Sequence, residues 1–177
     1  DLHKTNLIGV DFFNANLKNV NLIESNLYRA NLSQANLRDA AVVKSDLSNS
    51  MLFNTNFSRT VLFYTNFSQA TFGITSLVNN DLGTCLGLAS STHIKPSMIS
   101  IGTIQNSKGK IPIEFLRGCG LSDIDIEYAK LANPELTTQE ISEITQNIFD
   151  LKATRPIQIS PLFISYSHAN SDFVDRI

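Results

Sequence analysis

The stretch ANLSQANLRDA at residues 30–40 decides how the first half of this chain folds. It contains the same five-residue pattern twice: a small residue, Asn, Leu and two polar residues. The pattern continues in both directions, because all sixteen residues taken every fifth position from Leu7 to Leu82 are Leu or Phe, except Val42. Leu2 extends the series backwards, and a small or short residue stands two places before each large one. A fixed period of this length indicates a repeat architecture.

A period of five fits neither a regular helix nor a flat strand. An α-helix turns about 100° per residue, so the leucines would spiral around it. In a strand, successive leucines would point to opposite faces because the side-chain period is two. Both conflicts disappear if each pentad is a very short strand followed by a corner. The small and the large residue then point inward together, and stacked coils enclose a dry axis.

The pattern resembles the motif A(D/N)LXX of the pentapeptide-repeat family, and the resemblance covers residues 1–84. It implies an all-β fold, a right-handed quadrilateral β-helix with four pentads in each coil. Sixteen pentads would give about four coils and a rod roughly 19 Å long. Residues twenty apart would then stack, which predicts a core ladder of Leu17, Leu37, Phe57 and Leu77.

Two sides of this predicted rod carry apolar residues that point outward. On the first side face the ladder Ile23, Val43 and Phe63 runs beside Ala41 and Val61. The opposite, second side face carries Phe13, Met51 and Phe53. Contiguous apolar residues on a surface are usually covered by another segment or by a binding partner. The alternatives are that the C-terminal segment folds over the first face, or that a protein partner or a second copy binds there, giving a homodimer. Glu24 and Lys44, one coil apart at the rim, are expected to pair weakly.

Composition and charge exclude several other functions. Residues 1–84 contain six acidic and six basic side chains, and the whole chain has a net charge of −2. This balance argues against nucleic-acid binding, which needs a basic surface, and against an acidic rod that mimics DNA. No apolar run reaches the roughly 18 residues of a membrane span. The three histidines lack metal-ligand spacing, so we predict no catalytic residue, cofactor or metal.

The chain begins at Asp1, in the middle of the pattern, so we expect it to be a fragment preceded by further repeats. Its two cysteines, Cys85 and Cys119, are 34 residues apart without a CxxC partner. We expect reduced thiols in a cytoplasmic protein, with a disulfide as the alternative.

The repeat register ends at Leu82, and an open solenoid end exposes strand edges and core side chains. We therefore predict a small α-helical cap and connector over residues 85–160. Short helices are expected at 111–117 and at 123–131, the second capped by Asp123. Thr137 and Glu140 form a capping-box pair for a third helix that reaches about Lys152.

The remaining sequence resembles parts of a second family. Residues 97–121 resemble the connector between pentapeptide repeats and TIR domains. PLFISYSHANSDFVDRI (161–177) resembles the first strand and the start of the first helix of a bacterial TIR domain, although Ser160 and Pro161 stand where an acidic residue is common. The resemblance implies a non-enzymatic scaffold that positions or oligomerises a TIR effector. In the alternative, the parent protein is a bacterial defence effector that hydrolyses NAD with a glutamate beyond Ile177.

Overall fold

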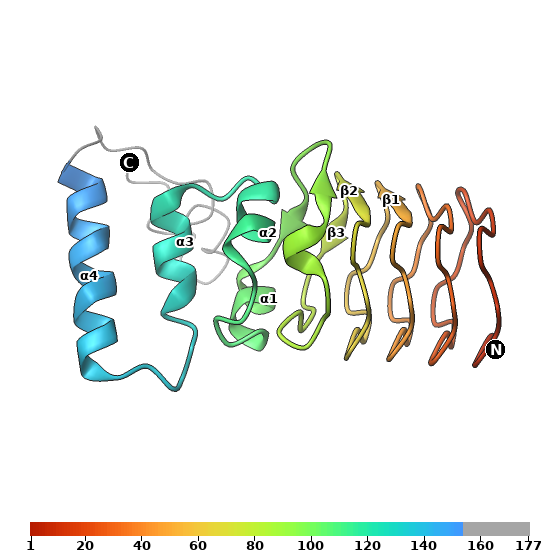
Figure 1. Cartoon of the computed structure of the whole chain (residues 1–177), viewed down its shortest axis with the longest axis horizontal. Coiled ribbons are helices and arrows are strands. Elements are labelled where there is room, and N and C mark those ends of the chain that lie inside the picture. Colours follow the sequence, from red (N-terminus) through yellow and green to blue (C-terminus); the bar gives the residue numbers. More distant parts are fainter. Residues whose placement is uncertain (154–177) are drawn as a thin grey trace, which may run out of the picture.

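The computed structural model describes residues 1–153. These residues form an elongated body in which stacked coils occupy one end and four helices the other (Figure 1). The predicted segments at 154–160 and 161–177 lie outside the described residues. No helix within residues 1–153 combines the length and apolarity needed to cross a membrane.

The repeat forms four-sided coils. Parallel bridges join residues twenty apart, as in the series Asn6, Asn26, Asp46 and Asn66. Twenty residues are four pentads, so the quadrilateral stacking predicted from the sequence is confirmed. Most bridges are isolated, and the only strands in this part of the described chain are β1 (Met51–Phe53), β2 (Thr71–Gly73) and β3 (Ser76–Leu77). The fold is therefore a ladder of single bridges more than a set of extended strands.

Each corner uses a left-handed backbone conformation. One residue per pentad from Lys4 to Asn79 has a φ between 54° and 64°. This conformation costs a non-glycine residue roughly 1–2 kcal/mol, and hydrogen bonds to the next coil offset it. At Glu24 the backbone N–H donates to the Val43 carbonyl at 2.8 Å, while the Asn21 side chain accepts from the Ile23 N–H at 3.1 Å.

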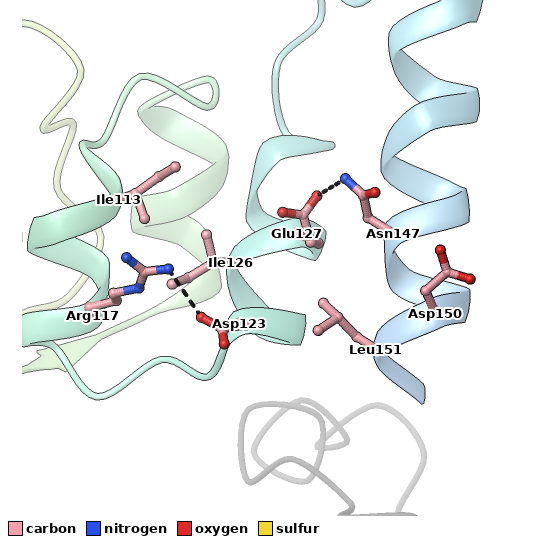
Figure 2. A pocket seen from close by; sticks show the side chains of 8 residues that line it. All are labelled: Ile113, Arg117, Asp123, Ile126, Glu127, Asn147, Asp150 and Leu151. Carbon is pink, nitrogen blue, oxygen red and sulfur yellow. Dashed lines mark hydrogen bonds and ion pairs between the residues drawn. The ribbon is translucent and has the colours of Figure 1, made fainter. Parts of the chain in front are cut away.

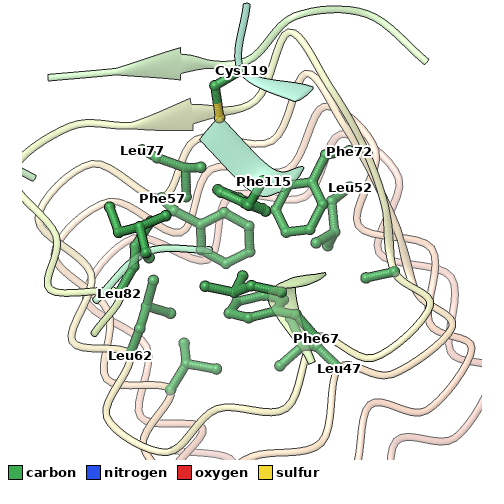
Figure 3. Close-up of a cluster of buried hydrophobic side chains, with 14 of the residues drawn as sticks. Leu47, Leu52, Phe57, Leu62, Phe67, Phe72, Leu77, Leu82, Phe115 and Cys119 are labelled. Atoms are coloured by element: carbon green, nitrogen blue, oxygen red, sulfur yellow. The ribbon is translucent and has the colours of Figure 1, made fainter. Parts of the chain in front are cut away.

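The coil interior is a continuous apolar column (Figure 3). Leu37, Phe57 and Leu77 are completely buried, whereas Leu17 is only half-buried because no coil of the described chain covers the first one. The short positions fill the remaining space, and their hydroxyls are satisfied across coils. For example, the Thr60 hydroxyl donates to the Leu37 carbonyl at 2.7 Å.

The predicted end of the β-helix at residue 84 is wrong, because an irregular fifth coil follows. Asn66 bridges to Leu86, β2 pairs with β4 (Thr92–His93) and β3 pairs with β5 (Met98–Ile99). The spacing between paired residues grows from 20 to 21 and then to 22. The short 3₁₀ helix η1 (Leu88–Ser90) lies within this coil. The extra residues destroy the five-residue register while the backbone ladder continues.

Four helices follow the fifth coil: α1 (Ile101–Asn106), α2 (Ile113–Gly118), α3 (Asp123–Lys130) and α4 (Thr138–Ala153). The last three were predicted, and α1 was missed. The Thr137–Glu140 capping pair is confirmed by two reciprocal bonds of 2.7 and 3.2 Å. The cap of α3 is Ser122, in a capping box with Asp125, and not Asp123 as predicted.

The helices continue the stack along the long axis of the molecule (Figure 1). Phe115 of α2 packs edge-on against Phe72, the last aromatic ring of the fourth coil, with 5.2 Å between ring centroids. Because Phe115 is 1% exposed, it extends the dry column of the coils into the helical part.

Candidate interaction surfaces

The structure brings the five predicted residues of the first side face together. Ala41 is bridged to Val61, and Val43 and Phe63 occupy the neighbouring column of the same two coils. Val61 and Phe63 remain 43% and 42% exposed, while Ile23, Val43 and Ala41 are half-buried. The described helices stack beyond the last coil (Figure 1), and Val61 and Phe63 stay exposed, whereas the turn at 107–110 lies against Gly83 at the fifth coil of this face. Residues 84–153 therefore leave Val61 and Phe63 uncovered, and the rest of the C-terminal segment lies outside the described residues.

Polar residues frame the first side face at its rim. Glu24 pairs with Lys4 at 3.4 Å and not with Lys44, which corrects the predicted ion pair. Both partners are well exposed, so the pair contributes little to stability. Ala41 and Val61 belong to a column of residues twenty apart, in which Asn21 stands one coil earlier and Asp81 one coil later. Polar residues therefore limit the apolar area to the middle coils.

The second side face is discontinuous. Phe13 and Met51 are about half exposed, but Ser33 separates Phe13 from Phe53 in their common column. Phe53 is half-buried, and the next position in its column is Gly73. A Cβ on Gly73 would lie 3.0 Å from the Phe53 ring and 2.8 Å from the Ile94 side chain. The fifth coil therefore reaches towards Phe53, and the first side face is the better candidate.

A charged cluster on a neighbouring side was not predicted. Arg59 donates two hydrogen bonds to the Asp39 carboxylate, at 2.7 and 2.9 Å, and Arg38 approaches the same group at 3.4 Å. The hydrogen bond from Arg59 lowers the pKa of Asp39. The signal was present in the sequence, because Asp39 and Arg59 stand twenty residues apart. Two arginines share one aspartate here, so this cluster keeps a net positive charge.

The helices enclose an open groove of about 450 Å³ (Figure 2). Arg117 of α2 pairs with Asp123 of α3 at 3.3 Å, and Asn147 of α4 donates to Glu127 of α3 at 3.4 Å. These contacts join α2 to α3 and α3 to α4 at the surface, where exposed pairs contribute little to stability. The sequence did not predict the groove, because its lining depends on the packing of three helices. Its other lining residues are Ile113, Ile126, Asp150 and Leu151.

Isolated reactive side chains form no site in the part of the chain that the structure describes. No group of three His, Cys, Asp or Glu residues there could hold a metal. Burial raises the pKa of both Cys85 and Cys119 to about 12, and neither is in a disulfide. His93 contacts the rings of both Phe72 and Phe115, at centroid distances of 5.2 and 4.8 Å, and these two rings also contact each other. Its position there indicates a packing role.

Four-sided coils with a dry interior define a quadrilateral β-helix. Residues 5–41 and 43–73 match the family model for pentapeptide repeats, in eight copies. This part of the chain therefore consists of pentapeptide repeats. Proteins of this kind are generally non-enzymatic modules for structure or protein interaction.

Several solved pentapeptide repeat proteins are similar to this chain. Rfr23 from the cyanobacterium Cyanothece 51142 is 23% identical, over 56% of this chain and 86% of its own, with a TM-score of 0.41. HetL from Nostoc, involved in the regulation of heterocyst differentiation, is 24% identical over 47% and 41%, with a TM-score of 0.25. A protein of the Arabidopsis thaliana thylakoid lumen is 20% identical over 82% and 91%, with a TM-score of 0.31. No curated protein matches the chain.

Proposed function

We propose that this chain is a non-enzymatic scaffold that holds a TIR domain at the helical end of a rod and associates with a second copy through its first side face. The observation that carries the proposal is the set of exposed apolar residues at Val61 and Phe63, continuous with Ile23 and Val43. The coil interior buries its apolar side chains almost completely, so these outward residues are not needed for the core. Contiguous apolar residues on a surface mark a site of interaction.

The build of the rod supports a positioning role. Backbone hydrogen bonds join every coil to the next, and the aromatic contact between Phe72 and Phe115 joins the coils to α2. The described chain leaves this stack at Ala153, at the end opposite to Asp1 (Figure 1). A domain that followed would be displayed at that end. The resemblance of residues 161–177 to the start of a TIR domain suggests which domain this is. We place the protein in the cytoplasm, where buried thiols stay reduced.

Replacement of Phe63 by Glu tests the association. The new carboxylate would be buried without a partner if copies meet at this face, so self-association should be lost while the coils stay intact. Light scattering at high protein concentration measures the mass, and circular dichroism checks the fold.

The matched control is Ile8→Glu. Ile8 is 53% exposed and occupies the same position of its pentad on a neighbouring face. It should leave the mass unchanged. If the wild-type chain and the Phe63→Glu variant have the same mass, this face does not join two copies.

A further inference from the structure

We infer that residues 154–160 (TRPIQIS), called the exit segment below, dock into the groove between α2, α3 and α4 and so hold the proposed TIR domain in a fixed place. This inference rests on the positioning role in the proposed function and adds the device that achieves it. It does not depend on self-association. Residues 154–160 lie outside the described residues, so we argue from their sequence and from the groove that the described helices form.

The groove has an apolar floor with one side chain that the described residues leave exposed. Ile113, at the start of α2, is 38% exposed, and Ile126 and Leu151 line the same groove from α3 and α4 (Figure 2). Ile113 and Ile126 also line a second, smaller hollow of about 200 Å³, whose other walls are mostly apolar. Apolar surface therefore continues from the groove into the hollow, with room for more than one apolar side chain.

Acidic side chains outnumber basic ones around the groove. Asp123, Glu127 and Asp150 line it, and Arg117 is the one basic residue of the lining. Arg117 pairs with Asp123, and Lys130 pairs with Glu127, so two basic groups stand against three carboxylates. Complementary charge favours an occupant that carries a positive group beside its apolar side chains.

The exit segment has this combination on one side. Pro156 disfavours a helical backbone at the residue before it, so an extended course is expected from Arg155 onwards. Side chains two residues apart point the same way in an extended chain. Arg155, Ile157 and Ile159 then share one side, and the other side carries Thr154, Pro156, Gln158 and Ser160. A positive charge followed by two apolar side chains matches the acidic and apolar parts of the lining.

The place of the exit segment in the chain favours it over a separate partner. Leu151 lines the groove, and Arg155 follows four residues later, within a reach of at most about 14 Å. A segment on so short a tether is present at its site at an effective concentration of about millimolar. The groove is therefore filled more readily by this segment than by a free protein.

Docking has a consequence for the proposed TIR domain. With residues 154–160 held against the helices, the stretch that resembles the first TIR strand would begin directly at the rod. A free exit segment of seven residues would instead let the domain swing about Ala153. The groove would thus set the orientation of the domain as well as its place.

Disulfide cross-linking within the full chain of residues 1–177 tests the docking. Ile157→Cys is combined with Ile113→Cys in the groove or, as a matched control, with Phe149→Cys. Phe149 is 66% exposed and, at about 100° per residue, lies on the side of α4 away from Asn147 and Leu151, which line the groove. It is also nearer to Ile157 in the sequence, so a freely moving segment would reach it at least as often as Ile113.

The expected result is that the link to Ile113→Cys forms several-fold faster than the link to Phe149→Cys. Equal rates, or a faster link to Phe149→Cys, overturn the docking. The chain is oxidised at low concentration so that links form within one copy, and peptide mass spectrometry identifies them. The native thiols give little background, because Cys119 is buried and Cys85 is half-buried. Circular dichroism checks that each variant is folded.

A second pair of variants tests the charge. Arg155→Gln and Thr154→Glu, each added to the chain with Ile157→Cys and Ile113→Cys, change the net charge by the same amount, but only Arg155 lies on the groove side. Arg155→Gln should slow the link roughly two- to five-fold at low salt, as expected for one exposed ion pair. Thr154→Glu should slow it less. Equal effects of the two variants overturn the role of Arg155.

The light-scattering comparison separates this inference from the proposed self-association. If the two links form at equal rates while Phe63→Glu lowers the mass, the copies still associate and only the docking is wrong. If the link to Ile113→Cys is favoured while Phe63→Glu leaves the mass unchanged, the docking holds and the self-association fails.

Discussion

At the scale of the residue, the position of a side chain within its pentad decides its environment. Leu37 and its short companion Ala35 are 0% and 1% exposed, while Arg38, between them and the corner, is exposed. The place of a pentad along the rod matters as well. Leu17 has the same role as Leu37 but is half-buried, because it lies in the first described coil.

This difference predicts unequal costs of truncation. Leu37→Ala should lower the free energy of unfolding by about 2–5 kcal/mol, because it removes buried contacts and leaves a cavity. Leu17→Ala, the matched control, should cost clearly less. Ala35→Leu should cost about 1–3 kcal/mol through overpacking. Urea denaturation of the three variants measures these changes, and equal losses for Leu37 and Leu17 would contradict the stacking order.

At the scale of the element, the junction between the coils and α2 depends on aromatic packing. The ring of His93 in β4 stacks on Phe72 and meets the edge of Phe115. Neither ring nitrogen has a hydrogen-bond partner among the described residues. Gly118 lies so close to His93 that a Cβ there would be 2.3 Å from its ring. The junction therefore suits a neutral imidazole and disfavours a charged one.

The junction should lose stability in acid. Burial lowers the pKa of His93 below its ordinary value of 6.5, so the unfolded chain binds a proton more readily than the folded one. The contribution of neutral His93 to the free energy of unfolding is therefore fully present above pH 6.5. It is lost as the pH falls from 6.5 towards the lower pKa that His93 has in the folded chain. Thermal unfolding measured on either side of this pH should show the loss.

Two variants assign this pH dependence. His93→Leu should reduce it, because no group at that position can then be protonated. His3→Leu, at an exposed residue of the first coil, is the matched control and should behave like the wild type. If His93→Leu keeps the full pH dependence, other groups are responsible for it.

At the scale of the whole molecule, residues 1–153 form an elongated stack of coils and helices, to which we assign the proposed interaction face on the side and the proposed attachment of a further domain at the helical end. Residues 1–153 contain polar groups in ion pairs and caps, such as Arg117 with Asp123 and Thr137 with Glu140.

The alternative function, NAD hydrolysis by the parent protein, follows from the resemblance of residues 161–177 to a TIR domain. If the parent protein hydrolyses NAD as the resemblance implies, we expect residues 1–177 alone to leave NAD intact, because the resemblance matches none of them to the catalytic glutamate of such domains. A longer parent chain with a complete TIR domain should cleave it. Chromatography of the nicotinamide product measures both. Turnover by residues 1–177 alone would contradict the assignment of catalysis to the missing part.

The sequence by itself determined the coil, because a five-residue register is a local pattern that each pentad repeats. The inward positions of Leu37 and Phe57 and the outward positions of Val43 and Phe63 all follow from it. The capping pair Thr137–Glu140 was also readable, since its two residues are three apart.

Only the tertiary structure decided the rest. Paired residues in the fifth coil are 21 and 22 apart, so the five-residue pattern does not predict this coil. His93 contacts Phe115 because the fifth coil places β4 next to α2. The uncovered state of the first side face likewise depends on where the helices stack. These features depend on contacts between residues far apart in the chain, and such contacts produce no periodic pattern in the sequence.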